Sequence, residues 1–139
     1  MNDIVINKIQ SMQRCVSRAR EEFEFAGGDL SSNITHQDAA VLNITRACEL
    51  AIDLANHLTK VRRLGIPTDS RETFELLAKA GLISAELAGC LQSMVGFRNV
   101  AVHDYRELDP EIVNWVIERG FDDLLTFADV VRKTLGEAI

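Results

Sequence analysis

Apolar residues recur every three to five positions along most of this chain, in segments separated by stretches that contain glycine or proline. Such spacing places the apolar side chains on one face of a helix with about 3.6 residues per turn. No segment alternates apolar and polar residues between hairpin turns, as strands would. The pattern therefore restricts the chain to an all-α fold, and we predict an up-and-down bundle of about five helices with short connections.

The helix boundaries follow from the breaking residues and the capping residues. Breaking stretches lie at GGD (27–29), GIPTDS (65–70), AGLIS (80–84) and ELDP (107–110). A first helix is expected from about Asp3 to Phe25, with Ile4 on its apolar face. A start resembling a capping box at Thr35 and an apolar series reaching Leu64 predict a long second helix.

Three further helix starts have clear sequence signals. Asp69 and Ser84 are expected to cap the third and fourth helices, because short polar side chains accept hydrogen bonds from the free N–H groups of a first turn. Asp109 followed by Pro110 predicts the start of the fifth, where proline's missing donor costs nothing. Gly120, inside the last apolar pattern, marks a kink, a close helix contact or a locally weakened helix.

Length and composition predict one cytoplasmic domain spanning residues 1–139. A chain of 139 residues can bury one core, and 47% apolar with 26% charged residues is typical of a globular protein. No apolar run reaches the roughly 20 residues that a membrane span needs, so no membrane association is expected. The N-terminal stretch also lacks the pattern of a secretory signal.

Neither a metal nor a cofactor is expected. Cys15, Cys48 and Cys90 are widely spaced within apolar helical patterns, which favours small core residues over a disulfide or zinc site. His36 and His57 have no neighbouring residues at the spacing of metal ligands. The glycine pair at 27–28 lacks the lysine of a phosphate-binding loop, so the chain itself is not predicted to bind ATP.

The formal net charge of −6 excludes proteins that hold nucleic acid on a broad cationic surface, but it permits a small basic site. The densest basic stretch, HLTKVRR (57–63), contains Lys60, Arg62 and Arg63. Cations near a helix C-terminus are favoured by the helix dipole, so these residues can be ordinary residues of a helix end. The alternative is that they guide an RNA backbone or meet an acidic partner.

The stretch RNVAVHDY (98–105) concentrates functional side chains at the expected end of the fourth helix. Asn99 and His103 are one helical turn apart and Arg98 stands beside Asn99, so the three are expected to converge on one groove. Val95 and Val102 are expected to face the core. The polar side chains would then be presented on a rigid helix.

These side chains suit cleavage of RNA by its own 2′-hydroxyl. The imidazole of His103 can donate or accept a proton, while Arg98 can stabilise the charge that develops on the phosphate. Asn99 can orient the imidazole or a phosphate oxygen. The structural alternative is that Arg98, His103 and Tyr105 are ordinary residues at a helix end, where cations are favoured by the dipole.

The order Arg98, Asn99, three residues and His103 resembles the Arg-polar-x-x-x-His motif of the HEPN superfamily. With Tyr105 added, RNVAVHDY resembles the signature of its HepT-type toxins, and the likeness in helix order covers nearly the whole chain. The resemblance implies a dimerising all-α domain that acts as a metal-independent endoribonuclease, with Arg98 and His103 catalytic and Asn99 supporting. Two motifs would face each other across a dimer cleft, and cleavage would leave a 2′,3′-cyclic phosphate.

The same resemblance implies a partner. In a toxin–antitoxin pair of the type VII kind, a minimal nucleotidyltransferase antitoxin, MntA-like, transfers AMP from ATP to the position that Tyr105 occupies here. The added bulk and negative charge beside His103 would oppose an incoming phosphodiester. The other function considered is a catalytically inactive helical module that only binds such a nucleotidyltransferase. A third, less favoured, is a domain that holds small nucleotides.

Overall fold

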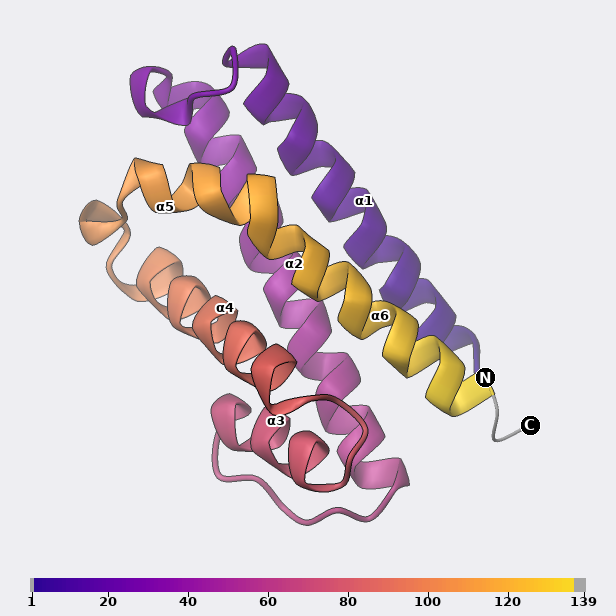
Figure 1. The fold of residues 1–139 in the computed structure, drawn as a ribbon. Coiled ribbons are helices and arrows are strands. Elements are labelled where there is room, and N and C mark those ends of the chain that lie inside the picture. Colours follow the sequence, from indigo (N-terminus) through magenta and orange to yellow (C-terminus); the bar gives the residue numbers. More distant parts are fainter. Residues whose placement is uncertain (1, 137–139) are drawn as a thin grey trace.

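The computed structural model describes residues 2–136, and all regular structure in that range is helical (Figure 1). The elements are, in chain order, α1 (Asp3–Phe25), a 3₁₀ turn (Leu30–Ser32), α2 (Ile34–Val61), α3 (Ser70–Lys79), α4 (Ala85–His103), a second 3₁₀ turn (Tyr105–Glu107), α5 (Pro110–Trp115), a π turn (Val116–Gly120) and α6 (Phe121–Gly136). The predicted all-α class is confirmed. The expected fifth helix is present as the continuous run of α5, π turn and α6.

The helices α1 and α2 run side by side in opposite directions and form the back of the bundle (Figure 1). Gly27 and Gly28 allow the sharp turn after α1, since their φ angles of 74° and 83° are strained for residues with a side chain. The helix α6 packs against α1, α2 and α4, while α4 packs against α2, and α3 lies against α2 and α4 at one end. This arrangement brings the start of α3 close to α4.

The ends of α2 differ from the prediction by a few residues. Asn33, not Thr35, is the capping residue, because its side chain accepts a hydrogen bond of 3.1 Å from the first turn. The helix ends at Val61 rather than at Leu64. The reason is Arg63, whose φ of 55° turns the chain out of the helical path.

The other predicted caps are confirmed. The side chains of Asp69, Ser84 and Asp109 each accept a hydrogen bond from a backbone N–H in the first turn of their helix, at 2.8, 3.0 and 2.9 Å. Each such cap is worth about 1 kcal/mol. These short-range signals fix the starts of α3, α4 and α5.

Gly120 marks both a local distortion and a close helix contact. It ends the π turn between α5 and α6 and is buried. A methyl group added to Gly120 would lie 3.2 Å from Sδ of Met94 on α4. The glycine therefore lets the last helical run approach α4 closely.

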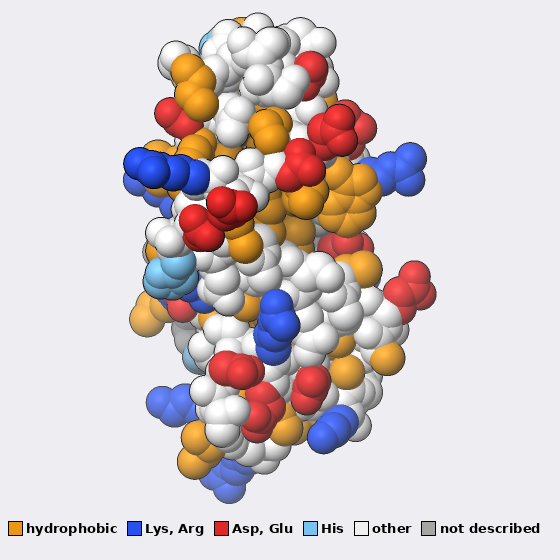
Figure 2. All heavy atoms as spheres, turned by 90° about the vertical axis from the view of Figure 1, so that its left-hand side faces the viewer, with side chains coloured by type: hydrophobic (Ala, Val, Ile, Leu, Met, Phe, Trp, Pro, Cys, Tyr) orange, Lys and Arg blue, Asp and Glu red, His pale blue; other side chains and the backbone are white. Residues whose placement is uncertain are grey.

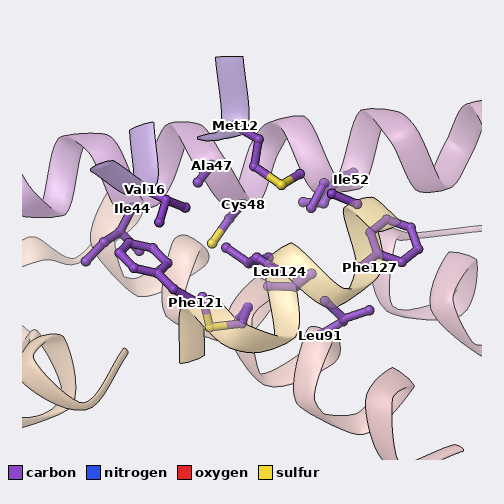
Figure 3. Packing of buried hydrophobic residues seen from close by; sticks show 14 of the residues in the cluster. Met12, Val16, Ile44, Ala47, Cys48, Ile52, Leu91, Phe121, Leu124 and Phe127 are labelled. Atoms are coloured by element: carbon purple, nitrogen blue, oxygen red, sulfur yellow. The ribbon is translucent and has the colours of Figure 1, made fainter. Parts of the chain in front are cut away.

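The core lies where α1, α2, α4 and α6 meet (Figure 3). Phe121, Leu124 and Phe127 extend from α6 among Met12 of α1 and Cys48 of α2, and all five are buried. The rings of Phe127 and Phe74 meet edge to face with centroids 5.6 Å apart. This contact joins α3 to α6 in the core.

Ile4 was expected on the apolar face of α1, but it is 66% exposed and Val5 is buried in its place. One residue of helix advances the side chain by about 100°, so a one-position error in phase is enough to reverse the assignment. In residues 2–136 no helix has the length and apolar character that crossing a membrane requires.

Candidate active site

The end of α4 carries the motif that the sequence singled out. The helix begins after Ser84 and ends at His103, where Asp104 leaves the helical conformation. Arg98 and Asn99 line a groove of about 430 Å³ between α4 and the start of α3. Asp69, Ser70, Arg71 and Val95 complete its walls.

Arg98 is half-buried between α4 and the neighbouring helices. Burial raises the pKa of the Cys48 thiol on α2 to about 12, and the positive charge of Arg98 acts in the opposite direction. The Nε atom is buried and has no hydrogen-bond partner within residues 2–136. Buried donors are nearly always paired, so the hydrogen-bonding capacity of this guanidinium is only partly used by the chain itself.

His103 does not share the groove with Arg98. It lies in the last turn of α4 and is exposed, as is Asn99 one turn earlier. Arg98 and His103 are five positions apart, which places them about 140° apart around the helix. The expected convergence of all three side chains on one groove is therefore wrong for a single chain, although Arg98 and Asn99 do meet there.

Val102 was expected to face the core, but it is 50% exposed. Val95 is buried as predicted, and Ala101 takes the core position in the last turn. The side chain of Val102 thus adds an apolar residue to the exposed surface beside His103.

Tyr105 lies in the 3₁₀ turn after α4 and is 37% exposed. Its hydroxyl donates a hydrogen bond to the carboxylate of Asp38 on α2. Burial raises the pKa of Tyr105 to about 12, and the Asp38 carboxylate adds to this effect by favouring the protonated hydroxyl. The hydroxyl is therefore held on α2 in its neutral form.

Because the chain has a single tyrosine, its titration can be followed by tyrosinate absorbance. We expect a midpoint near pH 12 instead of the ordinary value of about 10. Asp38→Asn should lower the midpoint but leave it above 10, because burial is the larger cause. The raised pKa stabilises the fold below about pH 10 and this contribution is lost as the pH rises toward 12, so circular dichroism must accompany the titration.

Asp53→Asn is the matched control, since Asp53 is an exposed carboxylate on the same helix that pairs with Lys8 instead. It should leave the midpoint of Tyr105 unchanged. A midpoint in Asp38→Asn equal to that of the wild type would contradict the assigned hydrogen bond.

The basic stretch at the end of α2 is divided by the fold. Lys60 and Arg63 line a second pocket, of about 760 Å³, together with the loop at residues 65–70. Arg62 does not line it, and its guanidinium donates to the backbone oxygen of Thr134 at 3.4 Å. The two pockets share Asp69 and Ser70, so they adjoin at the start of α3.

Two residues at the site were not predicted from the sequence. Arg71 lines the groove of Arg98, and Asp38 binds the hydroxyl of Tyr105. Asp69–Ser70–Arg71 has only the pattern of a helix start, and Asp38 lies 67 positions from its partner. Neither contact can be predicted from the sequence without knowing how the helices pack.

The charge pattern on the side of the molecule formed by α4 and α5 is mixed (Figure 2). Lys and Arg side chains are scattered among Asp and Glu and do not gather into one broad patch on this face. Within residues 2–136 no three His, Cys, Asp or Glu side chains are grouped so that they could share a metal ion.

Comparison with known proteins gives consistent results along the whole chain. The profile of the family described as "Ribonuclease HepT-like" matches residues 8–131. The mRNA nuclease HepT of Shewanella oneidensis is 44% identical over 132 residues, which cover 95% of this chain and 98% of that protein.

Solved structures show the same architecture. One is described as the tri-AMPylated Shewanella oneidensis HEPN toxin in complex with MNT antitoxin. It superposes with a TM-score of 0.89 at 43% identity and covers 96% of this chain and 99% of that one. A toxin–antitoxin complex with AMP-PNP gives a TM-score of 0.88 at 43% identity, covering 94% and 99%.

Proposed function

The chain belongs to the HepT-like ribonuclease family of HEPN proteins, and from this we propose that it is the endoribonuclease toxin of a toxin–antitoxin pair. The observation that carries the proposal is the 44% identity to an mRNA nuclease over almost the full length of both proteins. It acts as one HEPN-like domain on RNA in the cytoplasm.

In the reaction that we propose, the ribose 2′-hydroxyl attacks the adjacent phosphorus and the bond to the 5′-oxygen of the next nucleotide breaks. His103 moves a proton in this step, and the Arg98 guanidinium stabilises the negative charge on the phosphate oxygens. Asn99 supports either group by hydrogen bonding. The products are a 2′,3′-cyclic phosphate and a free 5′-hydroxyl.

The geometry supports a site shared between two copies of the chain. Arg98 lines the groove beside α3, whereas His103 is exposed in the last turn of α4 and does not line that groove. In a homodimer, or a larger homo-oligomer, with the two α4 ends facing each other, the His103 of one copy can reach the phosphate that the other copy binds. The exposed Val102 beside His103 suits burial in such a contact.

We further infer that the toxin is neutralised by AMPylation of Tyr105 by a partner nucleotidyltransferase antitoxin. Tyr105 is two residues from His103, and its side chain is partly exposed to solvent. Transfer of AMP from ATP to the Tyr105 oxygen, with pyrophosphate leaving, would remove the hydrogen that bonds to Asp38 and place a phosphate beside that carboxylate. Repulsion would drive the modified turn away from α2.

The proposal also assigns the guidance of the RNA backbone to Lys60 and Arg63, whose pocket adjoins the groove of Arg98. Arg62 is less well placed to guide the RNA, because its guanidinium contacts the end of α6.

Cleavage of RNA by the purified protein should continue in excess chelator. The proposed reaction uses a guanidinium, an imidazole and the hydroxyl of the ribose itself, so it needs no metal-bound water. Initial rates on a labelled RNA, measured with and without chelator at constant ionic strength, should agree within about twofold. An activity that disappears in chelator and returns with added divalent ion would contradict this mechanism.

A further inference from the structure

Arg71 lies at the start of α3 with its side chain directed along α4. Its backbone oxygen accepts a hydrogen bond of 2.9 Å from the side chain of Gln92. A methyl group added to Gly96 would lie 3.0 Å from Nη2 of Arg71. The guanidinium is therefore placed over α4 at Gly96, less than one turn before Arg98.

The charges of Arg71 and Arg98 are both available to a ligand. Within residues 2–136 neither guanidinium forms an ion pair with a carboxylate. The carboxylate nearest in sequence, Asp69, accepts the N–H of Glu72 as the cap of α3. Two arginines that line one groove repel each other unless an anion lies between them, and the chain as a whole is acidic.

We propose that Arg71 binds an RNA phosphate that neighbours the cleaved one. The inference rests on the proposed ribonuclease function and adds a substrate-binding residue to it. A guanidinium binds phosphate oxygens with two parallel hydrogen bonds, so Arg71 and Arg98 can hold successive phosphates of one strand along the groove.

The path of the strand beyond Arg71 is given by the adjoining pocket. Asp69 and Ser70 form the shared wall, and Lys60 and Arg63 lie on its far side. A strand that leaves Arg71 in this direction meets these two cations next. The order of contacts along the RNA is then Arg98, Arg71 and the pair Lys60 and Arg63.

The test uses an oligonucleotide with one ribonucleotide, placed where the wild-type protein cleaves, in an otherwise 2′-deoxy strand. Each phosphate next to the cleaved one is replaced in turn by an uncharged methylphosphonate. For the wild type, one replacement should lower kcat/KM by roughly tenfold or more, as expected for a lost hydrogen bond between charged groups. On the unmodified strand, Arg71→Gln should lower kcat/KM by the same factor relative to the wild type. The methylphosphonate should then lower the kcat/KM of this variant little further.

Arg46→Gln is the matched control, because Arg46 lies on α2 in a separate groove beside α1 and its replacement removes the same charge. It should retain the wild-type sensitivity to both replacements. The inference is overturned if Arg71→Gln cleaves the unmodified strand with the same kcat/KM as Arg46→Gln. It is also overturned if each methylphosphonate lowers the kcat/KM of Arg71→Gln as much as it lowers that of the wild type. A wild-type protein that cleaves no RNA at all instead refutes the ribonuclease function, and the inference with it.

Discussion

Replacing His103 with alanine is expected to lower the rate constant for RNA cleavage by roughly 10²–10⁴-fold, the usual contribution of a positioned general acid or base. The imidazole is the group in the motif that can both donate and accept a proton, and neither Arg98 nor Asn99 can take over that role. Because His103 is exposed at the end of α4, its removal leaves no cavity in the core. Single-turnover cleavage of a labelled RNA measures the effect.

His57→Ala provides the control, since His57 is a half-buried histidine on α2 outside the motif. It should cleave at the wild-type rate. Thermal unfolding and the oligomeric state should be the same for His103→Ala and the wild type. If His103→Ala cleaves RNA as fast as the wild type, His103 is not the group that transfers the proton. If neither the wild type nor the variant cleaves RNA, the chain is better explained as a helical module that binds a nucleotidyltransferase.

Changing Tyr105 to phenylalanine is expected to abolish neutralisation while cleavage continues. The variant lacks the hydroxyl oxygen that AMP requires, but it keeps the ring packed in the turn after α4. Incubation with the partner nucleotidyltransferase and ATP should add AMP to the wild type alone, as measured by intact mass. Co-expression of the partner should then rescue the growth of cells with the wild type and fail with the variant.

The loss of the hydrogen bond to Asp38 must be separated from the loss of the acceptor hydroxyl. Asp38→Asn keeps the hydroxyl and changes only its partner, so it should still accept AMP and still be neutralised. The stability of Tyr105→Phe should fall by no more than about 1 kcal/mol, because the freed carboxylate is exposed. An AMP group on the same peptide of the phenylalanine variant would refute the assignment of Tyr105.

The parts of the fold that depend on local signals could be predicted from the sequence. Asp69, Ser84 and Asp109 cap their helices as expected, because a cap involves only the next two or three residues. The π turn at Val116–Gly120 could not be predicted, since it accommodates the close approach of Gly120 to Met94 on another helix. Tertiary packing of this kind has no signal within one segment.

In the candidate site, too, only the features that depend on local spacing could be predicted from the sequence. Helical spacing correctly placed Arg98 and Asn99 side by side at the end of α4. It did not indicate that Arg98 turns toward α3 while Val102 and His103 face solvent, because that depends on which neighbours cover the helix. Arg71 and Asp38 join the site only through the packing of α3 and α2 against α4 and the turn that follows it.

In the proposed reaction, Arg98 and His103 drive attack by the ribose hydroxyl on its own phosphate. The most direct measurement compares two oligonucleotides that differ only in the 2′-hydroxyl at the cleaved position, with the new ends identified by mass spectrometry. We predict a 2′,3′-cyclic phosphate from the ribonucleotide strand and no cleavage of its 2′-deoxy counterpart. Equal cleavage of both strands, or a product with a 5′-phosphate, would contradict the account.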